Sequence, residues 1–485
     1  MVASTAVHSN AFNFLGALQN GVDPRTGQYT VSIELPALKT NALNGPSIPL
    51  VLRFNPLQLS DHGFGYGWGL QLTQYDVSTQ IISLHTGETY KIDGWDTESA
   101  RAIISEQKLD TFHLYDESNG TYRVMHVSGE MEILVDQGTV ALPEEYYSAE
   151  GQKIVLAYND FEGRPLLNTI IDANDLLVLS VTREPGDSFI HIDLFPFSGE
   201  GGKPVARYSM ELTGDEQRVT QIHLPSEDKA LWAFTYGRFF DCLCIESVSS
   251  PAGSKEEITY DAQGHEHPAP GSQKIPRVAK HRVLPLFEQP AIEHHYTYST
   301  ENFLGYGAGN FDWDDDGRDN LYKVLTDYNY SSTQSLIVEG SAVRTQTRTF
   351  NRYHLLTLDV TKQNGHVYRA HTEYAININQ PFHQQRVYCQ LPVKTTQTWY
   401  LADNINQIRS TNTLYTYNHR GLLTSHTFDT GVVEQYTYYS PNGEDSEGYF
   451  CPPDPEGFVR YMRNKTAIPA GGNFEVAPPT LLTRY

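Results

Sequence analysis

The sequence is poor in the residues that build disulfide and metal sites. Its 485 residues include four cysteines and five methionines. The spacing of Cys242, Cys244, Cys389 and Cys451 matches neither a zinc site nor a disulfide framework. Cys242 and Cys244 are one residue apart and would face the same way in a strand. We expect buried thiols in a reduced compartment, with a single disulfide bridge as the alternative.

Long apolar runs are also missing. No stretch of about 18 apolar residues occurs, so no transmembrane helix is expected. Residues 1–18 lack a basic segment followed by a continuous apolar run, which argues against a Sec signal peptide. We therefore expect synthesis in the cytoplasm without such a signal.

Positive charge is scarce. The chain has 35 basic and 58 acidic residues, for a net charge of −23. An acidic surface repels phosphate backbones and anionic lipids, so binding to nucleic acid or insertion into a membrane is disfavoured. The charge serves solubility or complements a basic cargo or partner.

Helical patterns are nearly absent, whereas aromatic residues are abundant. Only residues 8–20 are compatible with a short helix. The chain has 31 Tyr and 21 Phe, set in short runs of period-two alternation such as residues 369–374 and 434–438. Such runs, separated by Gly, Asn, Asp and Pro, are typical of many short strands. The sequence predicts an all-β fold of antiparallel hairpins.

Four segments repeat one pattern: an aromatic residue, then Asn or Asp, usually Gly, then apolar residues. The residues are Tyr158, Asn159 and Gly163; Tyr260, Asp261 and Gly264; Phe350 and Asn351; and Tyr417, Asn418 and Gly421. An Asn or Asp side chain can start a turn by accepting from the backbone two residues on, and Gly supplies a positive φ. Two further hairpins are predicted, with turns at 86–88 and 128–130.

A single hairpin cannot bury its apolar face, so successive hairpins must pair edge to edge. The accumulated twist then curls the sheet. We expect a long curved sheet or part of a hollow β-shell. The strand-like residues 482–485 carry no capping signal, and we expect more of the shell to follow them.

The repeated turn resembles the YD repeat, whose core reads tyrosine, aspartate, two variable residues and glycine. Other segments are similar to bacterial Rhs proteins of the pseudomonad type, in particular to their N-terminal part. These segments are residues 21–29, 49–52, 65–68, 303–307 and 451–460. The chain thus resembles the Rhs/YD-repeat family, which is related to toxin-complex shells.

The resemblance implies a hollow shell that encloses a C-terminal toxin, as in insecticidal toxin complexes and type VI effectors. The family's self-cleaving core, its toxin domain and a spike-binding motif are absent here. The chain is therefore expected to be a non-catalytic piece of the wall. Its partners would be the rest of the shell and a toxin cargo, exported together for bacterial competition or virulence.

The resemblance also suggests four regions. Residues 1–95 would be the opening strands and 96–267 a hairpin-repeat region. Residues 268–290, rich in proline, would form a linker or a strap. Residues 291–485 would be a YD-repeat region with an open C-terminal end.

One acidic loop is a candidate metal site. The residues predicted to form this site are Asp312, Asp314, Asp316, Arg318 and Asn320. The alternation resembles the start of a calcium loop. The twelfth position is Lys323 and not Glu, so this is no EF-hand, and the shorter loop of FG-GAP-type propeller repeats fits better. The interpretations are a structural calcium site and a solvated acidic turn.

Other candidates favour structural roles. The histidine pairs His265/His267 and His294/His295 supply fewer ligands than zinc needs. Residues 454–457 and 23–27 superficially resemble the self-cleavage signature, and each is more simply a turn. No phosphate loop or nucleophile elbow is present, and we expect no enzyme activity and no cofactor besides calcium.

Two other functions remain open. Tyr- and Trp-rich β-surfaces bind sugars by stacking, which gives a carbohydrate-binding or adhesive surface protein as the alternative. The five tryptophans are dispersed along the chain, which favours packing roles. A glycosidase on an all-β scaffold would require a pair of carboxylates in a cleft.

Overall fold

The computed structural model describes residues 7–17, 20–38, 40–48, 50–287, 289–309, 312–446, 448–472 and 478–485. Its helices are short 3-10 segments: η1 (Asn10–Ala17), η2 (Asn41–Leu43), η3 (Glu200–Gly202), η4 (Asn320–Lys323) and η5 (Phe382–Gln384). The helix expected within residues 8–20 is therefore η1. Among the described residues, no helix is long and apolar enough to cross a membrane.

Nearly all other regular structure is β, which confirms the predicted fold class. The N-terminal strands are β1 (Asn20–Val22), β2 (Tyr29–Glu34), β3 (Val51–Phe54), β4 (Trp68–Leu70), β5 (Gln74–Asp76), β6 (Ile81–Ser83), β7 (Thr89–Lys91), β8 (Gly94–Trp95) and β9 (Ala102–Ile103). The next strands are β10 (Phe112–Ser118), β11 (Thr121–His126), β12 (Met131–Asp136), β13 (Ala141–Tyr147), β14 (Lys153–Phe161), β15 (Arg164–Asp172), β16 (Leu177–Thr182), β17 (Phe189–Leu194), β18 (Ala206–Thr213), β19 (Arg218–His223), β20 (Leu231–Phe239), β21 (Cys242–Ser249) and β22 (Lys255–Tyr260).

The remaining strands follow in the second half of the chain. They are β23 (Val278–Leu284), β24 (Ile292–Tyr298), β25 (Asn329–Val338), β26 (Ser341–Asn351), β27 (Leu356–Gln363), β28 (His366–Tyr374), β29 (Pro392–Leu401), β30 (Asn404–Tyr417), β31 (Leu423–Thr427), β32 (Val433–Tyr438), β33 (Glu444–Ser446), β34 (Tyr449–Cys451), β35 (Met462–Ile468) and β36 (Leu481–Arg484).

One antiparallel sheet of 28 strands dominates the molecule. It runs in sequence order from β10 to β32 and continues through β35 and β36. Strand β5 joins it by pairing with β13, and β6 and β7 follow β5. Strand β23 lies inside the proline-rich segment and pairs with both β22 and β24. The two halves of the chain therefore share one continuous sheet, made of the predicted hairpins.

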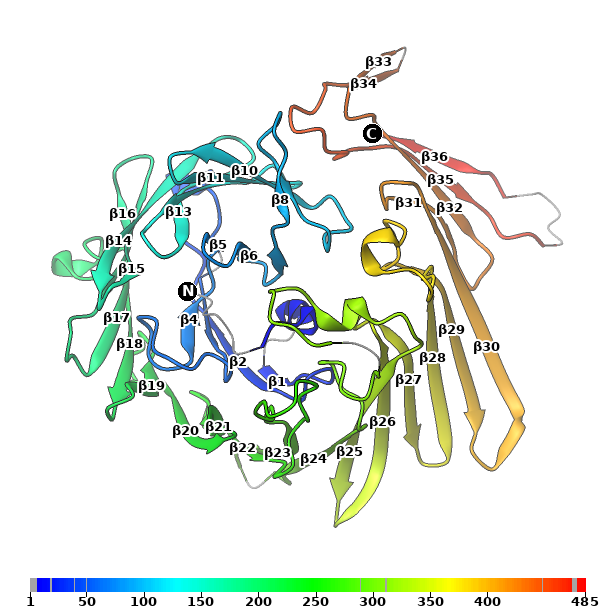
Figure 1. Ribbon diagram of the computed structural model, residues 1–485, viewed down its shortest axis with the longest axis horizontal. Helices are drawn as coiled ribbons and strands as arrows, with labels where there is room; N and C mark the ends of the chain where they lie inside the picture. The colour runs from blue at the N-terminus through cyan, green and yellow to red at the C-terminus, as the bar shows by residue number, and fades with distance from the viewer. Residues whose placement is uncertain are drawn as a thin grey trace.

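The sheet winds around the N-terminal segment and is not closed into a barrel (Figure 1). Strands β1–β4 form their own four-stranded sheet. Figure 1 shows this small sheet and η1 on the inside of the curve formed by β13–β26. The N-terminal segment therefore fills the inside of the curve that β13–β26 form.

The contact between the two layers is a large apolar core. Buried residues of the N-terminal segment pack against the inward faces of the strands from β13 to β26. Trp68 is fully buried and lies 5.1 Å from the Phe234 ring, measured between centroids. Its indole Nε1 donates to the hydroxyl of Tyr236 at 3.0 Å. The hydrogen bond satisfies the one polar atom of this side chain inside the core.

A tyrosine opposite a bulge recurs with one geometry in six strands: it ends β22, β28, β30 and β32, and it lies three residues before the end of β14 and β20. At each, the next strand in the sheet holds one extra residue opposite the tyrosine, a β-bulge. Thr416 pairs with Ser425 but Tyr417 pairs with Leu423, so Thr424 is the extra residue. The tyrosine hydroxyl reaches the other way and donates to a carbonyl of the preceding strand. The pairs are Tyr158–Pro143, Tyr236–Val219, Tyr260–Ile245, Tyr374–Leu356, Tyr417–Pro392 and Tyr438–Leu423, at 2.6–3.1 Å.

Two of the predicted repeat turns use an Asn side chain as a double acceptor. Asn418 Oδ1 accepts from the amides of Arg420 and Leu422, and Gly421 has a φ of +78°. Asn351 repeats this arrangement with His354 at the positive-φ position, which explains why that segment lacks the glycine.

The other predicted turns vary this theme. Asp261 accepts from the Gln263 amide, and Gly264 follows with a positive φ. Asn159 lies inside β14, and the tight turn there is formed by Glu162 and Gly163. Two turns with the same double acceptor start at Asp172 and Asp454. The segment 454–457 is therefore a turn, as the sequence analysis predicted.

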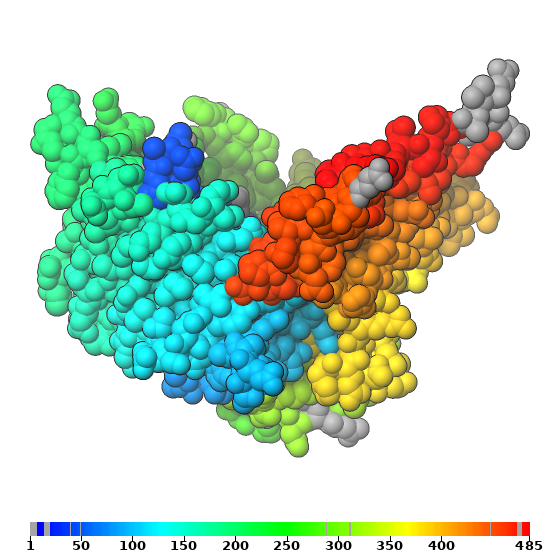
Figure 2. Space-filling view, turned by 90° about the horizontal axis from the view of Figure 1, so that it is seen from above, coloured from blue at the N-terminus to red at the C-terminus, as the bar shows by residue number. Residues whose placement is uncertain are grey.

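The C-terminal strands lack a covering layer. From β27 to β36 most described residues are half-buried or exposed. Trp399 is 38% exposed, and in β36 Leu482 is 53% exposed. Figure 2 shows these strands, in orange and red, projecting from the body of the molecule. The sheet therefore has a packed half and a half with both faces accessible.

The tyrosine hydrogen bond can be tested by removing one hydroxyl. We expect Tyr417→Phe to lower the stability by about 0.5–1.5 kcal/mol, the usual net value of one hydrogen bond. Tyr415→Phe is the control, because Tyr415 lies on the same strand and no described residue hydrogen-bonds its hydroxyl. The measurement is the midpoint of urea denaturation. Equal midpoints for the two variants would contradict the role given to the hydroxyl.

Candidate functional site

The predicted calcium loop is a network of ion pairs. Asp314 and Asn320 exchange hydrogen bonds across the loop: the Asp314 amide donates to Asn320 Oδ1 at 3.0 Å, and Asn320 Nδ2 donates to the Asp314 carbonyl at 2.7 Å. The ammonium of Lys323 lies 2.9 Å from Asp314 Oδ2 and 3.5 Å from Asp316 Oδ1. Asp312 is exposed. A calcium ion would have to displace this ammonium, so the calcium site stays a prediction and the contacts favour the acidic turn.

The loop is also tied to the N-terminal segment. The guanidinium of Arg318 pairs with Asp316 and with Asp93, which lies between β7 and β8. Gly317 has a φ of +80°, and a Cβ there would lie 2.9 Å from Ile81 of β6. Glycine is favoured here because this φ strains an L side chain, and a Cβ would also press on the tip of the Ile81 side chain. The loop thus works as a contact between layers.

A buried polar cluster lies next to this loop. Asp319 Oδ2 accepts from Ser9 Oγ at 3.0 Å and lies 2.9 Å from His354 Nε2. The other ring nitrogen of His354 lies 2.9 Å from the hydroxyl of Tyr330. Burial would raise the pKa of Asp319, but the imidazole of His354 and the hydrogen bonds hold it below its ordinary value.

Ser9, His354 and Asp319 have the composition of a catalytic triad but not its geometry. In a triad the histidine lies between the serine and the carboxylate. Here the same nitrogen of His354 faces Asp319 at 2.9 Å and Ser9 at 3.5 Å, and the serine donates directly to the carboxylate. His354 is 0% exposed. The cluster therefore fastens residues 9–10 to the turn between β26 and β27.

Glu106 adds a second carboxyl to this cluster. Its Oε1 accepts from the Asp319 amide at 3.1 Å, and its Oε2 accepts from Asn10 Nδ2 at 3.0 Å. Burial, together with the charge of Asp319, raises the pKa of Glu106 to about 8. Glu106 is therefore protonated at neutral pH. A cavity of about 550 Å³, lined by His8, Ser9 and residues of β3–β7, lies beside the cluster.

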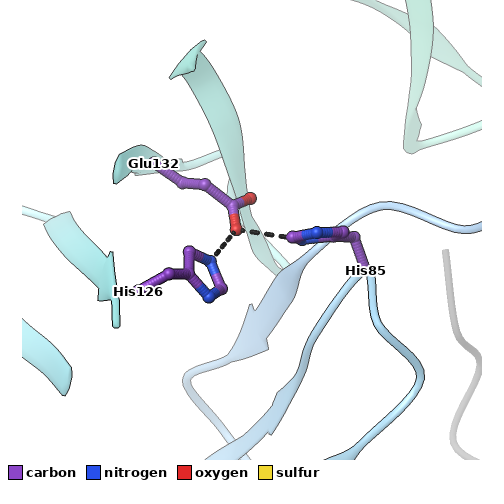
Figure 3. Close-up of side chains that lie close together, drawn as sticks. All are labelled: His85, His126 and Glu132. Atoms are coloured by element: carbon purple, nitrogen blue, oxygen red, sulfur yellow. Dashed lines mark hydrogen bonds and ion pairs between the residues drawn. The ribbon is translucent and has the colours of Figure 1, made fainter. Parts of the chain in front are cut away.

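A second buried cluster joins His85, His126 and Glu132 (Figure 3). His126 Nε2 lies 2.8 Å and His85 Nδ1 lies 3.3 Å from Glu132 Oε1. Thr73 Oγ1 donates to the same oxygen at 2.9 Å. Burial would raise the pKa of Glu132, but the hydrogen bonds from the two imidazoles lower it to about 2. Within the described residues, this is the one group of three potential metal ligands that converges.

The sequence analysis missed both clusters, although it contained a sign of the second. In β11 the inward positions alternate as Tyr122, Val124 and His126, and in β12 they are Glu132 and Leu134. A histidine and a glutamate on apolar faces indicate a buried polar pair. The partner His85 comes from a distant turn, which no local pattern identifies.

The other predicted residues stay apart from any such site. His265 is buried, and its Nε2 lies 3.1 Å from the Thr26 carbonyl. His267 packs on Trp313, and His295 pairs with Glu293 at the surface. The four cysteines are free and buried, as expected.

The raised pKa of Glu106 predicts a pH dependence of stability. Between pH 4.5 and about 8 the folded protein holds a proton that the unfolded chain has lost, so stability falls as the pH rises through this window. We expect Glu106→Gln to reduce this fall by up to a few kcal/mol, since one pKa unit corresponds to about 1.4 kcal/mol. The measurement is the denaturation midpoint from pH 4.5 to 8.5. The exposed Glu150→Gln is the control, and an identical pH profile for both variants would contradict the assignment.

Comparisons with known proteins place the chain beside toxin-complex structures. No family model and no curated protein matches the sequence. It is similar to a chain of the TcdB2-TccC3 crystal structure, at 9% identity and a TM-score of 0.28, over 96% of this chain and 36% of that chain. It is also similar to a chain of the TcdB2-TccC3-Cdc42 crystal structure, at 10% identity and a TM-score of 0.23, over 88% of this chain and 22% of that chain. A chain of the Photorhabdus luminescens Tc holotoxin pore is similar at 11% identity and a TM-score of 0.20, over 86% of this chain and 23% of that chain. The chain thus spans between about a fifth and a third of the length of these three chains.

Proposed function

We propose that this chain is a non-catalytic wall segment of an Rhs/YD-repeat shell that encloses or carries a toxin polypeptide. The observation that carries the proposal is the continuous 28-stranded sheet, which curves around the N-terminal segment without closing. A structure of this kind provides a concave wall. The toxin would be supplied elsewhere, and the assembly would be exported as part of a toxin or secretion complex.

The C-terminal half supports the proposal because it needs partners. Strand β36 pairs with β35, and no described residue pairs with its other edge. An unpaired edge with exposed leucines is a template for a further strand. The uncovered faces of β27–β32 can receive another polypeptide, and the net charge of −23 suits a basic one.

The absence of a catalytic role is argued from the clusters. The imidazole within reach of Ser9, that of His354, faces Asp319 and Tyr330 through its two nitrogens and is not positioned as a base for the serine. Asp319 and Glu106 are 1% and 8% exposed, so a substrate has little access to either carboxyl. Each cluster joins the N-terminal segment to the wall, which is a structural task.

The alternative is a carbohydrate-binding or adhesive surface protein. The observation that favours it is the half-exposed Trp399, whose ring lies 5.5 Å from that of Tyr368. Aromatic pairs on a β-surface can stack on sugar rings. Glycan binding that Trp399→Ala abolishes would favour this alternative over the shell.

The shell proposal predicts strand addition at β36. The Tyr485 amide donates to the Arg463 carbonyl of β35, and alternate residues of a strand face the same neighbour. The amide of Leu482 therefore points to the free edge, and Leu482→Pro removes it without breaking the β35–β36 pairing. We expect this variant to lose assembly with the polypeptides encoded beside the gene, and Leu482→Ala to retain it.

The measurement is co-purification followed by cryo-electron microscopy. We expect a strand of the partner on β36 and polypeptide density on the concave side of β27–β32. A sheet that ends at β36 in the purified assembly, with both faces of β27–β32 in solvent, would overturn the proposal. Assembly that Leu482→Pro leaves intact would place the contact elsewhere than at β36 and contradict the predicted strand addition.

A further inference from the structure

We propose that His85, His126 and Glu132 form a zinc site that fastens the β6–β7 hairpin to the β11–β12 hairpin of the wall. This inference is independent of the proposed shell function. It rests on the convergence of three ligand side chains from two distant hairpins at one buried point (Figure 3).

The distances fit a zinc ion after a small adjustment. The ligand atoms of the three side chains all lie within 4.8 Å of one another, and the two nitrogen–oxygen separations are 2.8 and 3.3 Å. Zinc binds imidazole nitrogen and carboxylate oxygen at about 2.0–2.2 Å in tetrahedral geometry, which places neighbouring ligand atoms about 3.4 Å apart. The two nitrogen–oxygen pairs therefore need to open by only about 0.6 and 0.1 Å to reach this spacing.

The backbone holds two of the ligands on one face of the wall. Glu132 pairs with Val124 across β11 and β12, which puts His126 diagonally opposite Glu132 on the same side. His126 ends β11, and its amide donates to Glu130 across the turn. The two side chains are therefore set by the strand register and not by a flexible loop.

The third ligand comes from the other hairpin. His85 follows β6, in a turn closed by the hydrogen bond from the Leu84 amide to the Glu88 carbonyl. The His85 amide also donates to Thr73 Oγ1 at 3.0 Å, and that hydroxyl donates to Glu132. Thr73 is fully buried and so orients both a histidine and the carboxylate, as the outer partners of metal ligands do.

A second observation points to a missing partner at the same place. Tyr146 lies opposite Glu132 in β13, and its ring packs edge-on against that of His85 at 5.9 Å. It is 2% exposed, and its hydroxyl has no hydrogen-bond partner in the described part of the chain. A water molecule bound as the fourth zinc ligand would supply one. Buried hydroxyls are rarely left unpaired.

The donor set selects zinc over the hard cations. Calcium takes six to eight oxygen ligands and magnesium six, mostly oxygen. Two imidazoles and one carboxylate match the zinc sites that have three protein ligands and a water molecule in the fourth position. The His85 side chain is 11% exposed, so the ion can enter from this side without unfolding of the wall.

The test is titration of the chelator-treated chain with Zn²⁺ by isothermal calorimetry. We expect one ion per chain and a higher thermal unfolding midpoint with zinc, because a ligand that binds the folded state stabilises it. Cobalt in place of zinc should show the absorption of a tetrahedral site. A chain that takes up no zinc, or whose midpoint zinc leaves unchanged, overturns the proposal.

The variants separate this site from adventitious binding. His85→Ala is the main variant, since His85 lies in a turn and its loss leaves the wall strands intact. We expect zinc affinity to fall by more than the roughly 10–100-fold that removal of an outer partner costs. His295→Ala is the matched control, because His295 also contacts a glutamate, Glu293 at 2.7 Å, but at the surface.

The outcomes decide the proposal in either direction. A folded His85→Ala chain that binds zinc as tightly as the parent overturns the proposal, and so does an equal loss in His295→Ala. Glu132→Gln should also abolish binding, and circular dichroism shows whether this variant folds. Should it not fold, the comparison of His85→Ala with His295→Ala still decides.

Discussion

The hydrogen bond from a tyrosine opposite a bulge to the carbonyl of the preceding strand is the constraint on which this architecture depends. A sheet that adds strand after strand must bend in a regular way, or it would open into solvent. Each of the six tyrosines faces a bulge on the next strand, and a bulge bends and twists the sheet locally. The hydroxyl, as at Tyr260 and Tyr417, ties the bend to the strand behind it. The curvature is thus repeated with the sequence unit.

The curvature gives the sheet a concave side, and the N-terminal segment fills part of it. The N-terminal segment supplies one face of the apolar core, centred on side chains such as Trp68 and Phe54. Apolar packing is not directional, so it does not by itself define where this segment sits. The buried polar groups do, because an unpaired carboxylate inside the protein is costly. Asp319 meets Ser9 and Asn10, and Glu132 meets Thr73 and His85.

The difference in burial between the two halves of the sheet follows from the position of the N-terminal segment. Strands that face the N-terminal segment have a buried side, whereas most described residues of β27–β36 are half-buried or exposed, with few buried exceptions such as Val367. The half without a layer carries the alternating Thr, Tyr and Gln of a two-faced strand, as in β29 and β30. A surface of this kind is stable only through its backbone ladder and its cross-strand pairs, and it is available for a partner.

The sequence by itself determined the all-β class, the hairpins and their turns, because period-two alternation and Asn, Asp and Gly turn chemistry act over a few residues. It even indicated Asn418 and Gly421 as equivalent to Asn351, where the structure adds that His354 takes the glycine position. Only the tertiary structure decided that η1 and the sheet of β1–β4 lie inside the curve and that Lys323 lies among the acidic side chains of the predicted calcium loop. The same holds for the meeting of His85 with His126 and Glu132. These contacts join residues far apart in the chain, and the path of the whole sheet, not any local pattern, brings them together.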